Sequence, residues 1–195
     1  RYTQMFKFGI FDRPVSQTPI DIERGGQAAR SIGEQSAVLL KNAGNILPLD
    51  ARTVRSIALI GQPDYAGKAV AGCCGGSSDV IPFYTVPPLE GIQKTLESLG
   101  STATVRLTLV NTDLSNLDDA IAAAKASEVA IVFAGTLSEE GRDLPTIALP
   151  DKQDAMIKAI AAANPRTVVV LKDNSATLLP WIHRVPAILE AWFPG

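Results

Sequence analysis

A pair of neighbouring glutamates is the group in this sequence best suited to chemistry. Glu139 and Glu140 stand in residues 135–153, which read GTLSEEGRDLPTIALPDKQ and also carry Arg142 and Asp143. A carboxylic acid can donate or accept a proton at neutral pH when burial or a neighbouring anion raises its pKa, which is what general acid/base catalysis requires. The residues alone also fit an ordinary solvated charged loop, because exposed charges usually have no special function.

The elements on either side of this segment position it at the end of a strand. Residues 129–134 form the apolar run VAIVFA, followed by Gly135, and such runs are typical of parallel strands covered on both faces. A helical pattern follows at 152–163, and we predict that Asp151 caps that helix. The glutamates therefore leave the carboxyl end of a buried strand, the edge at which open α/β sheets bind ligands.

The remainder of the chain alternates between strand and helix patterns. Apolar runs predict strands at 57–60, 105–110, 129–134, 167–171 and 187–191, and amphipathic segments between them predict helices at 88–99, from 115 onward and at 152–163. This alternation implies right-handed βαβ units. We therefore predict an α/β fold, a three-layer sandwich with a mostly parallel, flavodoxin-like sheet.

The N-terminal part is less regular. We interpret residues 1–20 as an interdomain connector and residues 21–195 as the sandwich domain. Asp21 is placed to cap a helix that ends near Ser36. Beyond it, two short extended pieces at 38–42 and 46–49 are predicted about a turn.

Composition narrows the function classes. The 195 residues are 46% hydrophobic, which is enough for one domain with a full core, and the net charge of −2 gives no reason to expect nucleic acid or an anionic membrane as a partner. No signal-peptide pattern and no apolar run of about 18 residues occurs. The adjacent Cys73 and Cys74, with the single histidine His183, supply neither a disulfide framework nor a zinc site nor a complete Ser-His-Asp centre. We expect no metal and no cofactor.

The segment after the first predicted strand invites comparison with a phosphate-binding loop. Five residues separate Gly61 from Gly67 where that loop has four, and Ala69 stands where a serine or threonine would bind magnesium. We therefore do not predict nucleotide binding. Because most connections have about 4 to 6 residues, the long segment 61–86 is expected to be functional or to rest on another domain, with a flexible surface loop as the alternative.

Short motifs along nearly the whole chain match one family in order and spacing. They include AAR at 28–30, EQSAVLLKN at 34–42, ILPL at 46–49, GGSS at 75–78, PLEG at 88–91, EG at 140–141 with Asp143, LP at 149–150 with Gln153, PW at 180–181 and AWFPG at 191–195. Taken together, they make the chain resemble the C-terminal catalytic-cleft domain of family 3 glycoside hydrolases, a group that includes many β-glucosidases.

The resemblance implies a retaining enzyme built from two domains. A (β/α)₈ barrel outside this sequence would supply an aspartate nucleophile, and the present domain the acid/base glutamate. The two carboxyl groups of a retaining glycosidase lie roughly 5 to 5.5 Å apart, so the loop must project across the domain boundary. The family pattern assigns the acid/base role to Glu140, with Glu139 as the alternative. Leu144 stands where the family usually has an arginine, so the loop's arginine anchor stays open.

The resemblance also implies binding residues. Ser77, Ser78 and Asp79 are candidates for the entrance on the leaving-group side, with ordinary loop polarity as the alternative, and Arg142 and Asp143 are candidates beside the acid. Trp181 and Trp192 are expected to lie in the core, with stacking on the sugar or on the barrel as the alternative. Lys41 and Asn42 are expected to be structural, and His183 to be a surface or packing histidine.

The implied partners are a carbohydrate substrate, the barrel, and a further C-terminal segment, because the family's chain normally continues beyond the point where this sequence ends. The sandwich is therefore expected to be truncated at its C-terminus. Secretion or a periplasmic location is favoured by the resemblance, while a cytoplasmic location and homo-oligomerisation stay open. The alternatives are a β-xylosidase or arabinofuranosidase of the same family, a non-catalytic module that shapes a cleft or binds carbohydrate, and a free-standing flavodoxin-like binding module.

Overall fold

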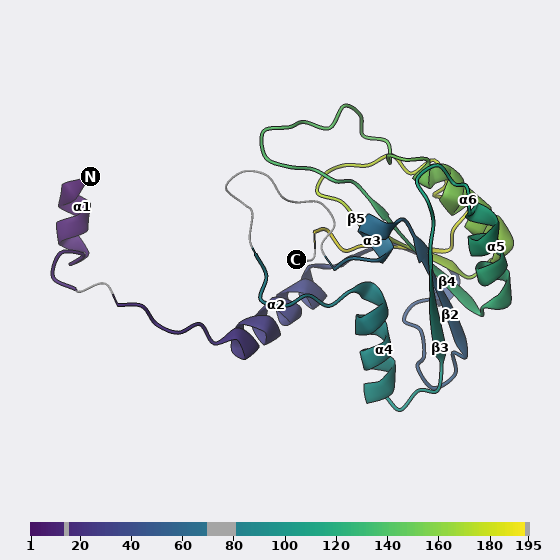
Figure 1. Ribbon diagram of the computed structural model, residues 1–195, viewed down its shortest axis with the longest axis horizontal. Coiled ribbons are helices and arrows are strands. Elements are labelled where there is room, and N and C mark those ends of the chain that lie inside the picture. Colours follow the sequence, from purple (N-terminus) through teal and green to yellow (C-terminus); the bar gives the residue numbers. More distant parts are fainter. Residues whose placement is uncertain (14–15, 70–80, 194–195) are drawn as a thin grey trace. The chain divides into compact units, whose positions relative to one another are not determined.

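The computed structural model describes residues 1–13, 16–69 and 81–193 (Figure 1). The chain divides into two compact units, Arg1–Ile32 and Gly33–Gly195. Helix α1 (Tyr2–Lys7) lies in the first unit, and α2 (Ile22–Ser36) begins there and ends in the second. Asp21 accepts a hydrogen bond from the backbone N–H of Arg24 at 3.0 Å, so its predicted capping role is confirmed. The interpretation of residues 1–20 as a connector stays a prediction.

A six-stranded sheet forms the middle layer of the second unit. Its strands are β1 (Val38–Asn42), β2 (Ser56–Gly61), β3 (Thr104–Leu109), β4 (Val129–Gly135), β5 (Thr167–Lys172) and β6 (Ala187–Glu190), in the order β1-β6-β5-β4-β2-β3. Strands β2 to β6 are parallel to their neighbours, and β1 pairs antiparallel with β6. Counted along the chain, the five parallel strands have the order 2-1-3-4-5 of flavodoxin-like sheets. The predicted fold class is confirmed, and β1 is an antiparallel addition at one edge.

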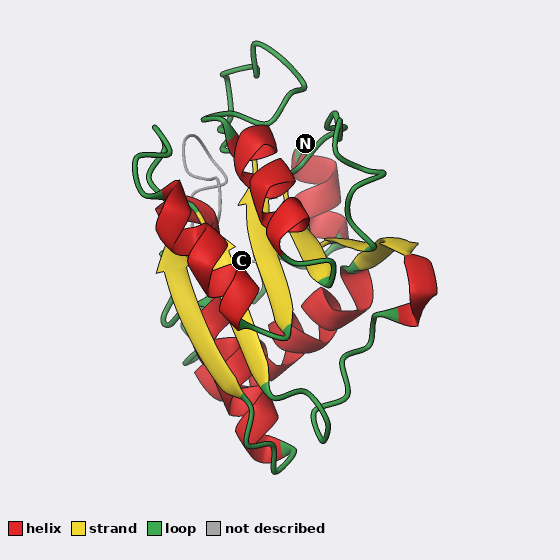
Figure 2. Ribbon diagram, turned by 90° about the vertical axis from the view of Figure 1, so that its right-hand side faces the viewer, coloured by secondary structure: helices red, strands yellow, loops and turns green. Residues whose placement is uncertain are grey.

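Helices cover both faces of this sheet (Figures 1 and 2). They are α3 (Pro63–Ala66), α4 (Pro88–Ser98), α5 (Leu117–Ala126) and α6 (Gln153–Ala163), and a 3-10 turn, η1 (Ala43–Asn45), follows β1. Helices α5 and α6 lie side by side on one face, and α4 lies on the other. The three layers agree with the sandwich expected from the alternating pattern.

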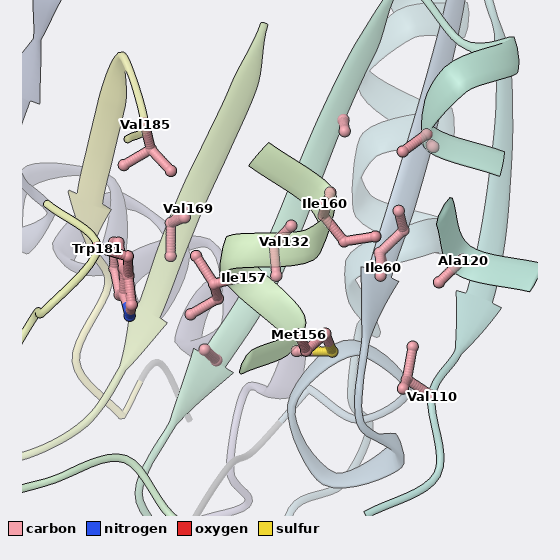
Figure 3. Packing of buried hydrophobic residues seen from close by; sticks show 14 of the residues in the cluster. Ile60, Val110, Ala120, Val132, Met156, Ile157, Ile160, Val169, Trp181 and Val185 are labelled. Atoms are coloured by element: carbon pink, nitrogen blue, oxygen red, sulfur yellow. The ribbon is translucent and has the colours of Figure 1, made fainter. Parts of the chain in front are cut away.

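The core is divided between the two faces by the alternation of strand side chains. On the α5–α6 face, Met156, Ile157 and Ile160 of α6 pack against Val132 of β4 and Val169 of β5 (Figure 3). On the opposite face of the sheet, a second cluster of buried hydrophobic residues includes Ile57, Leu59, Leu96, Ile131 and Phe133. Every residue of β4 is buried, which explains its continuous apolar run.

The strand order reverses between β2 and β4, so the carboxyl ends of these neighbouring strands form the switch point of the sheet. Gly61 of β2 pairs with Phe133, and Gly135 of β4 pairs with Lys172 of β5. The loops that follow β2, β4 and β5 therefore leave the same edge of the sheet, as predicted.

Two local predictions are wrong. Asp151 does not cap α6: the N-cap is Lys152, which makes no side-chain capping bond, and both residues are left-handed with φ of +53° and +60°. The Asp151 carbonyl instead accepts a hydrogen bond from Gln62 Nε2 at 2.7 Å, so tertiary contacts decide this helix start.

Residues 46–49 form no strand, because the Asn42 side chain bonds both the N–H and the C=O of Leu47, at 3.0 and 2.8 Å. Asn42 is structural, as expected.

Candidate active site

The loop after β4 carries the candidate acid at the corner of a tight turn. In Figure 1 it is the long green trace beyond the strand ends. Glu139 and Arg142 form an isolated antiparallel bridge, and the Arg142 N–H lies 3.4 Å from the Glu139 carbonyl oxygen. Gly141 has φ +78°, the value that the third residue of a type II turn requires. Glu140 is therefore the second residue of the turn, and it is exposed.

The neighbouring carboxylate has a different environment. Glu139 Oε1 lies 3.3 Å from Nη1 of Arg142, and the two side chains are 39% and 80% exposed. Such an exposed ion pair contributes only about 0 to 1 kcal/mol, but it joins the two ends of the turn. The structure thus places Glu139 and Arg142 in the turn and Glu140 at its corner.

Asp143, another predicted site residue, follows the turn directly. Asp143 is exposed and Leu144 is half-buried in the segment that leaves the turn. Ser77, Ser78 and Asp79 lie outside the described residues, so their assignment stays a prediction.

The loop after β4 is attached to the loop after β5. Ala148 bridges Leu178 in parallel register, and the Leu178 N–H donates to the Ile147 carbonyl at 2.8 Å. Three large apolar side chains on these joined loops are exposed by about half: Leu137 by 44%, Ile147 by 52% and Leu178 by 53%. Apolar side chains gathered on one rim are typical of a surface that another domain covers.

A lysine that sequence reasoning did not single out lies buried at the end of β5. The side chain of Lys172 is 2% exposed, and its Nζ donates to the carbonyl oxygens of Tyr65 at 3.0 Å and Lys68 at 2.8 Å. Burial lowers the pKa of Lys172 to about 8. The lysine therefore attaches the end of β5 to the segment around α3. The one sequence signal for it was a charged residue ending an apolar strand.

Two further carboxylates, also missed in the sequence, lie buried at the carboxyl ends of β5 and β6. Burial raises the pKa of Glu190, and the negative charge of Asp173 raises it further, to about 7. The hydrogen bond that the Trp192 N–H donates to Glu190 lowers the pKa and opposes these effects only in part. Asp173 also accepts a hydrogen bond from the Thr177 hydroxyl at 2.7 Å.

The residues expected to be structural lie as follows. Trp181 is fully buried and donates from Nε1 to Asp154 at 2.7 Å, which confirms a core role. The expected core position of Trp192 is wrong: its side chain is 41% exposed, and its Nε1 donates to the Ser36 carbonyl at 3.0 Å, near the surface at the end of α2. Lys41 Nζ donates to the Ile182 carbonyl at 2.5 Å, and His183 is exposed.

Within residues 1–13, 16–69 and 81–193, no three histidine, cysteine, aspartate or glutamate side chains gather closely enough to hold a metal ion. None of the helices in this described part of the chain combines the length and the apolar character needed to cross a membrane.

The fold and the loop together define a doubly wound α/β domain that presents a glutamate-bearing turn at the carboxyl edge of its sheet. Residues 37–195 match the sequence profile described as the glycosyl hydrolase family 3 C-terminal domain, and the chain belongs to this family. The resemblance drawn from the short motifs is confirmed.

Individual relatives agree with this assignment. Thermostable β-glucosidase B of Acetivibrio thermocellus is 35% identical over 198 residues, covering 96% of this chain and 25% of that protein. An exo-α-(1→6)-L-arabinopyranosidase of Bifidobacterium longum is 32% identical over 190 residues, covering 90% of this chain and 24% of that protein. The crystal structure of DesR, a β-glucosidase from Streptomyces venezuelae in complex with D-glucose, has a TM-score of 0.84 at 24% identity and covers 100% of this chain and 38% of that one, which shows a shared fold. The chain spans about a quarter of the length of these curated relatives.

Proposed function

We propose that this chain supplies the general acid/base of a retaining glycoside hydrolase that releases terminal β-linked sugars, as a β-glucosidase does. The observation that carries the proposal is the position of Glu140: it occupies the corner of an exposed turn at the carboxyl edge of the sheet, in a domain of family 3. That edge is where doubly wound folds bind ligands.

In the proposed reaction, two domains share the chemistry. A (β/α)₈ barrel of the same enzyme supplies an aspartate that attacks the anomeric carbon, while the Glu140 carboxyl donates its proton to the departing glycosidic oxygen. The Glu140 carboxylate then removes a proton from the water that releases the sugar. The two carboxyl groups must approach to roughly 5 to 5.5 Å, which a residue on a projecting turn can achieve and a residue inside the sheet cannot.

The local geometry favours Glu140 over Glu139. The Glu139 carboxylate pairs with Arg142 across the turn, so using it as the acid would disrupt the contact that joins the two turn ends. Glu140 stands between these two residues, at the corner of the exposed turn. Arg142 is thereby proposed as a residue that shapes the turn, and Asp143 as the next polar group along the same rim.

The apolar rim supports the expected partner. Leu137, Ile147 and Leu178 present half-exposed side chains on two joined loops, one of which carries the Glu140 turn. A barrel domain that covers this rim would bury them and exclude water from the site, which strengthens electrostatic interactions there. Residues 1–20 are proposed as the connector to that barrel, and a further C-terminal segment is proposed to complete the domain.

The sugar is a separate question. One relative carries the name of a β-glucosidase and another that of an exo-α-(1→6)-L-arabinopyranosidase, so relatives of comparable identity act on different sugars. A glucoside is the leading proposal, and a pentoside is the second candidate, favoured by the arabinopyranosidase relative. Hydrolysis rates of the intact enzyme on aryl glucosides, xylosides and arabinosides would separate them.

The acid role is tested with two matched variants of the intact enzyme, Glu140→Gln and Glu139→Gln. Loss of a general acid removes about 10²- to 10⁴-fold in rate, but only where the leaving group needs a proton. Glu140→Gln should therefore lose turnover of alkyl glucosides far more than of dinitrophenyl glucosides, and azide should restore part of the activity. The Glu139→Gln variant should show neither effect. Equal losses on both substrates in Glu140→Gln would refute the assignment.

A further inference from the structure

One side chain closes the loop that carries Glu140 at its base. Gln153 is the first residue of α6 and is fully buried. Its Oε1 accepts a hydrogen bond from the Gly135 N–H at 2.9 Å, and its Nε2 donates to the Gly135 carbonyl at 3.0 Å. Gly135 is the last residue of β4, so these two residues bracket the whole loop from 136 to 152. A single amide therefore holds the start of the loop against its end.

The two Gln153 hydrogen bonds take the place of strand pairing at Gly135, which β2 is too short to reach. The last residue of β2, Gly61, pairs with Phe133, two positions before Gly135, so no β2 residue reaches the backbone of Gly135. Buried backbone N–H and C=O groups require partners, and the Gln153 amide supplies both. The interaction thus continues the sheet by one rung at the point where the chain leaves it.

The backbone conformation just before Gln153 directs its side chain toward Gly135. Asp151 and Lys152 both have left-handed φ values, of +53° and +60°, which non-glycine residues adopt rarely. Gln62, from the loop after β2, holds the Asp151 carbonyl at 2.7 Å. Strained backbone that tertiary contacts maintain is typical of functional sites. Here it directs the first side chain of α6 onto Gly135, the strand residue that immediately precedes the acid loop.

We infer that Gln153 is a positioning residue for Glu140, which it holds in register with the reacting sugar by closing the base of the loop. This inference rests on the proposed function and extends it, because Gln153 itself touches no substrate. Loop ends held together restrict the conformations of the residues between them. A displacement of about 1 Å in a catalytic group can cost roughly a hundredfold in rate, so a clamp at the loop base can affect turnover from a distance.

The chain offers a matched control in Asn164, a second buried amide that clamps backbone. Its Nδ2 donates to the carbonyls of Ala124 at 2.8 Å and Ser127 at 2.9 Å, and its Oδ1 accepts from the Arg166 N–H at 2.8 Å. Asn164 is 5% exposed and lies just before β5, at the amino edge of the sheet, away from the acid loop. Asn164→Leu therefore removes a comparable clamp without touching the proposed site.

The experiment compares Gln153→Met, Asn164→Leu and Glu140→Gln in the intact enzyme. Both clamp variants should lower the melting temperature. Of the two clamp variants, only Gln153→Met should lower kcat on alkyl glucosides by roughly ten- to a hundredfold, with a smaller loss on dinitrophenyl glucosides. Of the two, only Gln153→Met should also speed hydrogen exchange at the Gly135 amide and across residues 136–148. Equal leaving-group behaviour of the two clamp variants would overturn the inference.

A conservative variant supplies a readout that a merely structural role would not give. The carboxyl group introduced by Gln153→Glu has the shape of the amide; when protonated it can donate to the Gly135 carbonyl and accept from its N–H, but when ionised it can only accept. Turnover of Gln153→Glu relative to the parent enzyme should therefore rise as pH falls, whereas that of Gln153→Met should not. A pH-independent ratio for Gln153→Glu would count against the clamp.

The outcomes separate this inference from the function on which it rests. If Glu140→Gln shows no dependence on the leaving group, the proposed function fails, whatever the Gln153 variants do. If Glu140→Gln behaves as an acid/base variant while Gln153→Met resembles Asn164→Leu, the function stands and the positioning role of Gln153 is wrong.

Discussion

Gly135 and Lys172 face each other at the carboxyl ends of β4 and β5, so closely that a Cβ atom on Gly135 would lie 2.0 Å from the Lys172 carbonyl oxygen. No side chain fits in that space, because the obstacle is backbone that belongs to the adjacent strand. The acid loop therefore departs from a point where two strands are in direct backbone contact.

Substitution at this contact should be costly. Gly135→Ala must separate β4 from β5, and overpacking of this kind typically destabilises by about 1 to 3 kcal/mol or more. Denaturant unfolding would measure the loss. Gly33→Ala is the control: a Cβ there meets nothing within 4 Å, and replacing a helical glycine should stabilise α2 by about 0.5 to 1 kcal/mol. An unchanged stability for Gly135→Ala would contradict the close approach.

The turn that carries Glu140 makes its own prediction. Gly141 has φ +78°, where a residue with a Cβ is disfavoured by about 1 to 2 kcal/mol, while asparagine tolerates such angles better than alanine. We expect Gly141→Ala to lower kcat on alkyl glucosides more than Gly141→Asn does, because the turn rearranges and moves Glu140. Steady-state kinetics of the two variants would check this order, and the reverse order would argue against the turn geometry.

The buried carboxylate pair predicts a pH dependence of stability. Glu190 has a folded-state pKa of about 7 against an ordinary value of 4.5, so between these values the native state holds a proton that the unfolded chain releases. Its contribution to the free energy of unfolding therefore falls as pH rises from about 4.5 to about 7. Glu190→Gln should remove this slope. The free energy of unfolding of the variant, relative to that of the parent protein, should therefore be higher at pH 8 than at pH 5, and urea unfolding at the two pH values would measure it. Parallel curves for the two proteins would refute it.

Lys172 predicts a slope of opposite sign at higher pH. Its pKa falls from 10.5 to about 8 on folding, so between these values the unfolded chain binds a proton that the native state lacks. The contribution of Lys172 to stability should thus rise with pH from about 8 to about 10.5. In Lys172→Met this rise should be absent, which unfolding free energies at pH 8 and pH 10 would reveal. If the free energy of unfolding had the same pH dependence in the variant and the parent, burial would not lower the pKa of Lys172.

Much of the fold could be predicted because its signals are local. The apolar run 129–134 reports its own burial on both faces, and Gly100, with φ +69°, ends α4 as a C-terminal glycine should. Asp21 begins α2 by a bond to a residue three positions away. Such interactions join residues that are close together in the sequence, so they can be predicted from it. The resemblance to family 3 added the assignment of Glu140 as the acid.

One of the failed predictions depended on a distant partner, and the other on a side chain outside the predicted strand. Asp151 has the residue type of a helix cap, but Gln62, far away in the sequence, holds its carbonyl, and the helix start turns left-handed instead. Residues 46–49 have the composition of a strand, but the Asn42 side chain takes the backbone groups of Leu47. In both cases a hydrogen bond from a side chain outside the segment outweighed the preference of the segment's own residues.

By itself, the sequence determined the class of fold, the family, and which loop carries a candidate acid, because apolar periodicity and short motifs need no knowledge of distant contacts. Only the tertiary structure decided which buried polar partners hold the strand ends around that loop: the Gln153 amide binds Gly135 at the end of β4, and Lys172 at the end of β5 binds the α3 segment. The physical reason is that a buried polar group must find a partner wherever the folded chain brings one. No spacing along the chain specifies which partner that is.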